Sequence, residues 1–456
     1  MLFIKLKIMK KVIFTMAFLT IFISCQNDDD YQEIDQSLLD DTLSELILDA
    51  SGEEGNSFFV LPDSDDFASI PQDPLNPITS AKVALGQLLL HDTAMGGDPK
   101  IEGREFQFAC ATCHPVAAGF NAGRRQGIGE GGIGFGLSGE GRFIDPLMPI
   151  DSVDVQPVRV PTLLNLAYQD VALWDGRFGG TGTNEGTEAG WELIPENFEG
   201  FQGIEVQAMQ GQDEHRLFID EAFVDTYNYR DLFDAAFPNI PEADRYSRRT
   251  AGLAIAAFNR TLLSNRAPWQ EYLKGDLTAM TKQQKRGAVV FFDQGKCVQC
   301  HTGPALKDKA FHAFGFGDFD GSSDAVIRPD VDINAVARGR GNFTGNAADD
   351  YKFKTPTLYN LIDGGFFGHG STFTSIRDVV AYKNEGVPQN TDVPSGQFAD
   401  QFGGLGLTET QINDLTAFLS DALRDRDLTR YVPEVSNSGF CFPANDPQAR
   451  IDLGCD

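Results

Sequence analysis

Apolar residues recur at helical spacing along much of this chain. In one segment they stand at positions i, i+3, i+4, i+7 and i+11, namely Ala251, Ala254, Ile255, Phe258 and Leu262. That order places all of them on one face of an amphipathic helix. No convincing run alternates between apolar and polar residues, as a half-buried strand requires. The pattern therefore predicts a mainly α fold with long glycine-rich loops between the helices.

Two capping boxes mark the starts of further helices. In a capping box a Thr caps the first turn, and a Gln three residues later bonds back to it. Thr281 with Gln284 opens a helix that leads towards residue 297, and Thr408 with Gln411 opens another. Residues 37–50 also have helical spacing, and we expect a short helix there.

The first 25 residues have the pattern of an export signal. A basic start is followed by the almost wholly apolar stretch 12–23 and then by Ser24 and Cys25. This stretch is shorter than the ~20 residues of a membrane span and has the length of a signal-peptide core. A small residue directly before a cysteine is similar to a bacterial lipoprotein processing site. We therefore expect residues 1–24 to be removed and Cys25 to carry lipid; an uncleaved anchor helix and ordinary signal cleavage are the alternatives.

This signal also predicts where the protein is found. Lipid on Cys25 would anchor the chain to the outer membrane of a Gram-negative bacterium. Everything downstream would then lie on the periplasmic side or at the cell surface, where disulfides form and persist.

Acidic residues dominate the charge and are concentrated near the N-terminus. The 456 residues include 66 Asp and Glu against 37 Lys and Arg, a formal net charge of −29. Such a surface repels phosphate backbones, so nucleic acid is not an expected partner. Residues 26–70 hold fourteen of the acidic residues and no Lys or Arg. This predicts a solvated, flexible tether over residues 25–71.

Two copies of C-x-x-C-H carry the clearest chemistry. They are Cys110, Cys113 and His114, and Cys297, Cys300 and His301. In this motif two thioether bonds hold a c-type haem, and the adjacent His becomes an iron ligand. A zinc site assembled from both pairs would leave about 180 residues between its halves, far from finger or ribbon spacing. Disulfides within each pair would not explain the His that follows both. We therefore expect two covalently bound c-type haems.

A glycine-rich segment satisfies the dinucleotide-binding pattern G-x-G-x-x-G at Gly127, Gly129 and Gly132. That function needs a preceding strand and a following helix. Two arginines precede these glycines and more glycine follows them, so we interpret the segment as a loop that passes over the first haem.

The order of motifs around the haem sites resembles the bacterial dihaem cytochrome c peroxidase and MauG family over residues 75–430. The chain carries L-G at 85–86 with H-D at 91–92, P-T-L-x-N at 161–165 and again at 356–360, and W-D-G-R at 174–177. The repeated phrase fits two duplicated cytochrome domains. The resemblance implies an N-terminal peroxidatic cytochrome c-like domain over residues 72–270 and a C-terminal electron-transfer domain over residues 271–432.

The resemblance also implies roles for the two haems. In the family the N-terminal haem meets hydrogen peroxide, and the C-terminal haem relays electrons from a small redox protein. The Trp of the W-D-G-R phrase lies between the haems, which assigns this role to Trp174; the alternative is an ordinary core aromatic. Val160 replaces the family's calcium-binding Asn, which argues against a calcium ion between the haems.

Some members of the family close the first haem with a distal His. Glu130, sixteen residues after His114, holds that position here, and no His occurs between His114 and His215. We therefore expect an open or water-bound first haem. Glu130 is then either an acid–base group or an exposed loop carboxylate.

The family also places a Gln and a Glu over the peroxide. The phrase at residues 204–208 assigns the Gln to Gln207, and the nearest candidate for the acid is Glu214, next to His215. Either Glu214 or His215 is expected to move a proton between the two peroxide oxygens. The alternative is that these two residues are a plain surface pair.

The second haem departs from the family pattern, in which the sixth ligand is Met, or Tyr in MauG. No Met follows Met280, and the matching position, fourteen residues after His369, is Lys383. On a helix Lys383 shares the apolar face, while Tyr382 points about 100° away. Burial lowers the pKa of a lysine, so the neutral amine is expected to bind iron. The alternatives are a Lys383 that reaches solvent, or ligation by Tyr382 or His369.

The remaining cysteines, Cys441 and Cys455, lie in a tail over residues 433–456 that is rich in Pro, Asn and Asp. Outside the cytoplasm, a mutual disulfide is the simplest expectation for them.

Together these features indicate a lipid-anchored dihaem c-type peroxidase that reduces hydrogen peroxide to water, with electrons entering at the C-terminal haem. The alternative enzyme is a MauG-like oxidase that uses peroxide to oxidise a protein side chain. The non-enzymatic alternative is a dihaem electron-transfer cytochrome, in which both irons would normally be six-coordinate.

Overall fold

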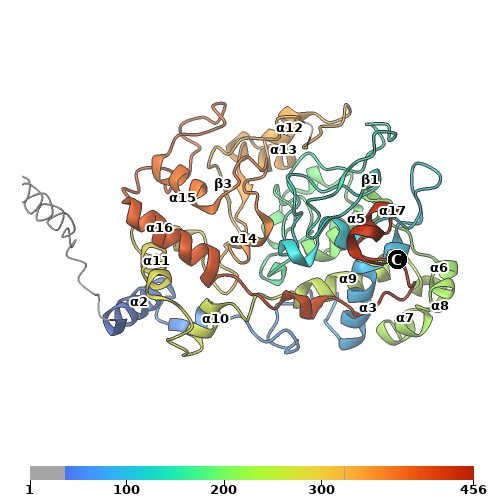
Figure 1. The fold of residues 1–456 in the computed structure, drawn as a ribbon, viewed down its shortest axis with the longest axis horizontal. Coiled ribbons are helices and arrows are strands. Elements are labelled where there is room, and N and C mark those ends of the chain that lie inside the picture. The colour runs from blue at the N-terminus through green and yellow to red at the C-terminus, as the bar shows by residue number, and fades with distance from the viewer. Residues whose placement is uncertain (1–35, 323, 456) are drawn as a thin grey trace, which may run out of the picture. The chain divides into compact units, whose positions relative to one another are not determined.

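Helices joined by long loops form the computed structural model, which describes residues 36–322 and 324–455 (Figure 1). The helices are α2 (Gln36–Ala50), α3 (Ser80–His91), α4 (Cys110–Cys113), α5 (Gly203–Glu214), α6 (Glu221–Thr226), α7 (Arg230–Ala236), α8 (Glu242–Arg245), α9 (Arg248–Thr261), α10 (Pro268–Leu273), α11 (Lys282–Phe292), α12 (Ile333–Ala337), α13 (Arg340–Thr344), α14 (Leu361–Gly364), α15 (Ile376–Glu385), α16 (Glu409–Ala417) and α17 (Pro447–Leu453). Two antiparallel strand pairs are formed by β1 (Gly132–Ile133) with β2 (Phe143–Ile144) and by β3 (Phe311–His312) with β4 (Phe353–Lys354). The predicted mainly α class is confirmed.

The export signal and the lipid-bearing Cys25 lie outside the described residues. Within the described part of the chain, no helix is both long enough and apolar enough to cross a membrane.

The helices predicted from spacing and capping are present. The apolar face expected over residues 251–262 belongs to α9, and its residues are buried. Thr281 caps α11 and Thr408 caps α16, each accepting a hydrogen bond from the backbone N–H of the Gln three residues later. The short helix expected at residues 37–50 is α2.

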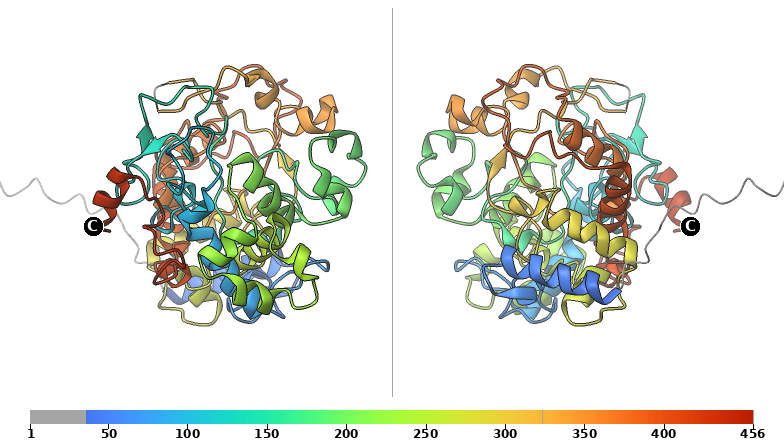
Figure 2. Two further views of the ribbon diagram at one scale, coloured as in Figure 1. Left: turned by 90° about the vertical axis from the view of Figure 1, so that its right-hand side faces the viewer. Right: turned by 90° about the vertical axis from the view of Figure 1, so that its left-hand side faces the viewer.

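Buried hydrophobic residues of the unit Asp40–Asp456 fall into two main clusters. In the first cluster α3 and α5 pack on α9, and in the second α11 packs on α16 (Figures 1 and 2). A glycine permits the close approach in each: a Cβ on Gly86 of α3 would lie 2.1 Å from the Ala254 carbonyl oxygen, and one on Gly287 of α11 would lie 2.0 Å from that of Asp414. The second cluster already includes Leu263, eight residues before the expected boundary at 271.

The repeated P-T-L-x-N phrase adopts the same local geometry in both halves. Asn165 and Asn360 both have φ of 57°, in the left-handed region that Asn tolerates. The backbone N–H of Asn165 donates to the Leu262 carbonyl at 2.7 Å, and that of Asn360 donates to the Leu423 carbonyl at 3.0 Å. Each Asn thus joins its loop to the end of a core helix, as expected of duplicated domains.

The prediction of a flexible tether over residues 25–71 was wrong from residue 40 onward. Leu43, Ile47, Phe59 and Leu61 are buried in the second cluster. The reason is that two apolar residues four apart give α2 a buried face, which the high count of acidic residues concealed.

One acidic residue of this segment is itself part of the packing. Asp40 pairs with Lys285 of α11 at 2.6 Å and accepts a hydrogen bond from Tyr272 at 3.0 Å. The Lys285 side chain is fully buried, so Asp40 neutralises a charge that water cannot reach.

The C-terminal tail packs on the first half of the chain. The predicted disulfide between Cys441 and Cys455 is present. Arg142 forms a buried ion pair of 3.1 Å with Asp446, and Ala444 bridges to Phe108. The tail is therefore an integral part of the first half.

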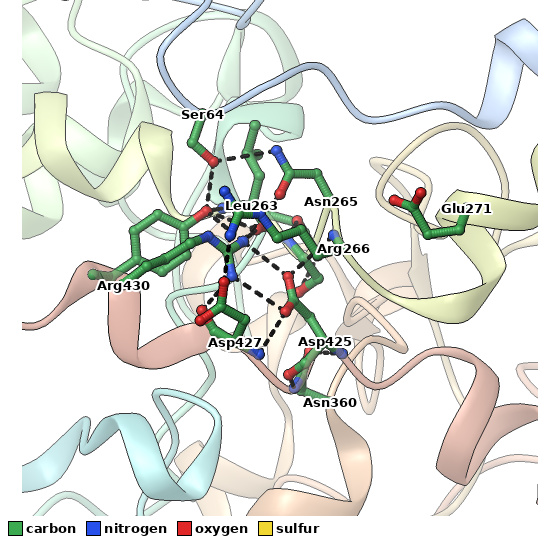
Figure 3. A network of polar contacts seen from close by, with 12 residues as sticks. Ser64, Leu263, Asn265, Arg266, Glu271, Asn360, Asp425, Asp427 and Arg430 are labelled. Atoms are coloured by element: carbon green, nitrogen blue, oxygen red, sulfur yellow. Dashed lines mark hydrogen bonds and ion pairs between the residues drawn. The ribbon is translucent and has the colours of Figure 1, made fainter. Parts of the chain in front are cut away.

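A network of polar contacts joins the end of the α9 region to the second repeat (Figure 3). Arg430 donates to the Leu263 carbonyl at 2.9 Å and to Asn265 at 3.0 Å, and it pairs with the buried Asp425 at 2.8 Å. Asn360 donates to the Asp425 carbonyl at 2.8 Å. The two halves are thus joined by directional bonds as well as by apolar packing.

Candidate functional site

A cavity of about 760 Å³ is lined by residues of both C-x-x-C-H motifs. These residues are Cys110, Cys113 and His114 from the first motif, and Cys300 and His301 from the second. The fold therefore brings the two motifs, far apart in sequence, to the walls of one cavity.

Both motif histidines are oriented as metal ligands. His114 Nδ1 lies 3.0 Å from the Phe120 carbonyl oxygen, and His301 Nδ1 lies 3.1 Å from that of Leu306. A carbonyl can only accept, so Nδ1 carries the proton and Nε2 keeps its lone pair for iron. Burial lowers the pKa of His114 to about 4 and that of His301 to about 3, so both rings are neutral at pH 7.

The motif cysteines are free thiols. Burial raises the pKa of Cys110 and Cys113 to about 12 and that of Cys297 to about 11. At pH 7 these free thiols therefore keep their protons and are not reactive thiolates. Neither pair is joined as a disulfide.

A second metal-ligand cluster overlaps the second motif. Cys300, Asp308 and His312 have ligand atoms within 4.8 Å of one another. The hydrogen bond that His312 donates to Asp308 contributes most to raising the pKa of His312 to about 9. Because Cys300 belongs to the second C-x-x-C-H motif, this cluster is part of the site already described.

Arg159 shows that the cavity fits a group with carboxylates. It lines the cavity and is 7% exposed, and burial lowers its pKa to about 10. One guanidinium nitrogen donates to Asn121 at 3.1 Å, while Nε has no hydrogen-bond partner among the described residues. Haem carries two carboxylates that would meet this charge. The donor sets, the cavity and Arg159 therefore all fit two c-type haems.

Three of the expected distal residues line the same cavity. Gln207 and Glu214 lie on α5, and His215 follows it directly. Glu214 is exposed at the rim, whereas His215 is half-buried. The alternative of a plain surface pair therefore does not describe His215.

Asp154, which the sequence did not single out, holds His215. Its two carboxylate oxygens both lie 3.0 Å from His215 Nδ1, and it is 2% exposed and also lines the cavity. Burial acts to lower the pKa of His215, but the charge and hydrogen bond of Asp154, with help from Glu214, outweigh burial and raise it. Charge on His215 in turn lowers the pKa of His114, so the two rings lie near the same end of the cavity.

The structure contradicts one of the two roles expected of Glu130, that of an exposed loop carboxylate. Its side chain is fully buried, and it accepts hydrogen bonds from the backbone N–H of Lys100 at 2.9 Å and of Ile101 at 3.0 Å. It also pairs with Arg216, and it is not among the residues that line the cavity. The loop folds back and its Glu130 carboxylate anchors the chain, while the acid–base role stays a prediction.

The glycine-rich segment is a loop beside the first motif. Gly127 and Gly129 line the cavity, and the segment runs into β1 rather than into a helix. A Cβ on Gly129 would lie 2.0 Å from an oxygen of Asp154, so glycine leaves room for that carboxylate. The structure therefore excludes the dinucleotide-binding interpretation.

Near the second motif, Lys383 and Tyr382 of α15 take different directions, as helical geometry predicts. Lys383 lines the cavity, and its Nζ lies 4.1 Å from the centre of the Phe314 ring. Desolvation lowers the pKa of Lys383, and its charge helps to lower the pKa of His301. Tyr382 is buried outside the cavity lining and donates to the carbonyl oxygens of Phe314 and Gly315, both at 2.7 Å.

Trp174 and His369 stand together in the cavity wall. Their ring centres are 6.3 Å apart, and Trp174 Nε1 donates to the Arg159 carbonyl at 2.8 Å. His369 Nε2 bonds to Asp318 at 2.9 Å, and its ring stacks on Phe353 at 3.7 Å. Trp174 thus lies in a space shared by both motifs, while the bridging role remains a prediction.

Comparison with known proteins finds relatives of two kinds. Residues 80–278 match the family model described as di-haem cytochrome c peroxidase. The cytochrome-c peroxidase IdrP1 of Denitromonas iodatirespirans is 28% identical over 371 residues, which cover 77% of this chain and 83% of that protein. The methylamine utilization protein MauG of Methylorubrum extorquens is 27% identical over 359 residues, covering 77% and 80%.

A solved structure shares the fold. The crystal structure of a MauG-like protein associated with microbial copper homeostasis matches with a TM-score of 0.55 and 22% sequence identity. The match covers 81% of this chain and 95% of the other.

Proposed function

Because the chain belongs to the family of the di-haem cytochrome c peroxidases and MauG proteins, we propose that it is a dihaem c-type peroxidase that reduces hydrogen peroxide to water. The observation that carries this proposal is the one cavity lined by both C-x-x-C-H motifs, each with its His turned for ligation. Bound haem would supply the redox chemistry that splits the O–O bond. The residues that would hold it are Cys110, Cys113, His114, Cys297, Cys300 and His301.

In this proposal His215 transfers the proton between the two oxygens of the peroxide. Reduction of peroxide to two waters needs two electrons and two protons, and a group must carry a proton from one oxygen to the other. Asp154 accepts from His215 Nδ1–H, which leaves Nε2 as the acceptor. Gln207, on the same cavity wall, would orient the peroxide.

The second half would pass the electrons on. Lys383 and His301 line the same cavity. Among the described residues, the Nζ of Lys383 has no ion-pair or hydrogen-bond partner. We assign it as the sixth ligand of the second iron. Electrons would enter there from a small redox protein, and Trp174 would lie on their way to the first haem.

The position of Tyr382 favours the peroxidase over a MauG-like oxidase. A tyrosine ligand is the feature that would mark the MauG branch, yet Tyr382 is hydrogen-bonded outside the cavity lining. Burial also raises its pKa to about 12, which disfavours the tyrosinate that iron binds.

The Cys441–Cys455 disulfide fits the expected location on the periplasmic side or at the surface, where disulfides persist. The lipid anchor at Cys25 would keep the enzyme at the outer membrane.

The test is hydrogen peroxide turnover by the haem-loaded protein with reduced cytochrome c or azurin as donor. We expect donor oxidation in step with peroxide loss, and none in a His114→Gly variant that retains both haems. Peroxide consumed without donor oxidation, with new oxidation of an added protein, would assign the oxidase instead.

A further inference from the structure

Two lysine side chains meet at one amide inside the cavity. Lys354, in β4, donates to Gln169 Oε1 at 2.7 Å, and Lys307 donates to the same oxygen. All three residues line the cavity, and Lys307 and Gln169 are 7% and 4% exposed. Lys307 follows the second haem motif, while Gln169 belongs to the first half, so the cluster lies where the halves meet.

Neither lysine amine is paired with a carboxylate of the described residues. Within residues 36–322 and 324–455, no carboxylate lies within ion-pair distance of either Nζ. The acidic groups that influence them are engaged elsewhere: Asp170 holds Thr183 at 2.9 Å and lies 3.7 Å from Lys309, and Asp308 pairs with His312.

A single amide oxygen is too little for two protonated lysines, and desolvation lowers the pKa of both, so they are charged together only beside an anion. Each has three donors, and a buried charge is costly unless it is paired. Both lysines line the cavity, so an anion that enters the cavity can complete the cluster.

We propose that Lys307 and Lys354 form a carboxylate site, and that a propionate of the haem carried by Cys297, Cys300 and His301 fills it. This inference rests on the proposed function. Haem brings its carboxylates on the edge opposite the thioether bonds, and the pair belongs to the cavity wall shared with His301. Positive charge at that edge favours the reduced iron, so the pair raises the reduction potential of the second haem.

The test measures the midpoint potential of each haem and the propionate bending band in resonance Raman spectra of the haem-loaded protein. Lys307→Met should lower the midpoint of the second haem and shift its propionate band. Lys307→Arg, which keeps the charge, should largely retain the wild-type potential. Lys309→Met is the matched control, because Lys309 is two residues away and its side chain is 59% exposed; neither quantity should change.

Separate outcomes distinguish the possible failures. If Lys307→Met does not fold, Lys354→Met should produce the same two shifts. Unchanged potentials and bands in a variant with both haems would overturn the carboxylate site. A wild-type midpoint that moves with added acetate or phosphate would also overturn it, because a free anion would then fill the site. Wild-type protein without covalent haem would overturn the proposed function itself.

Discussion

Asp154→Asn removes one charge at nearly constant size and tests whether His215 moves the proton. In the structure His215 Nδ1 lies 3.0 Å from both oxygens of a carboxylate that is 2% exposed. A hydrogen bond to a charged group contributes about 1.5–3 kcal/mol, and about 1.4 kcal/mol is tenfold in rate. Asp154→Asn should therefore slow the reaction with peroxide by about 10- to 150-fold. His215→Ala removes the group itself and should cost about 10²–10⁴-fold.

The pH dependence should shift as well. Only neutral His215 can accept a proton, so the rate should rise with pH as the imidazolium is lost. Asp154 raises the pKa of His215 above its ordinary value against the effect of burial. Removing that charge lowers the pKa, so the rise should occur at lower pH in Asp154→Asn.

Stopped-flow mixing of the oxidised holoprotein with peroxide, followed in the Soret band across pH, measures both effects. Asp213→Asn is the matched control, since Asp213 lies two residues before His215 and its side chain is 56% exposed. An unchanged rate and pH profile in Asp154→Asn would refute the reasoning. So would a fast His215→Ala beside a slow Glu214→Gln, which would assign the proton transfer to Glu214.

The remaining predictions concern the haems and the tail. Denatured wild-type protein should keep two haems per chain by pyridine haemochrome, and Cys110→Ala with Cys113→Ala should keep one; no covalent haem would remove the basis of the proposal. Lys383→Ala should turn the second haem high-spin or open it to imidazole, whereas Tyr382→Phe should leave the spectrum unchanged; the reverse pattern would make Tyr382 the ligand. Arg142→Met leaves the buried Asp446 unpaired and should lower the free energy of unfolding by about 3–5 kcal/mol, measured by denaturant titration. Arg230→Met, at exposed ion pairs, should cost about 1 kcal/mol or less, and equal losses would contradict this assignment.

The features that sequence predicts best here depend on local spacing. Capping boxes, the apolar face of α9 and the two haem motifs are each specified by residues within a few turns of one another, and all are present. The different directions of Lys383 and Tyr382 followed from helical geometry alone.

Features that depend on long-range packing were not predictable in this way. Asp154 and His215 are 61 residues apart in the sequence, and no local sequence pattern around either residue predicts their contact. The exposed position expected of Glu130 was wrong for the same reason, since its partners are set by how a long loop folds back on Lys100 and Ile101. Composition also misled for residues 40–71, because Leu43 and Ile47 determine packing while the acidic residues determine only the charge.

Each half is completed by a segment from the other end of the chain, which affects how the protein is assembled. Residues from Leu43 to Ile78 complete the core of the second half, and the tail that holds Asp446 completes the first half. A ribosome makes the first haem motif long before the last residues that cover it. The first half is therefore complete only when the last residues of the chain are in place. Cutting the gene at the boundary between halves would leave both products incomplete, so a one-haem version cannot be made by simple truncation.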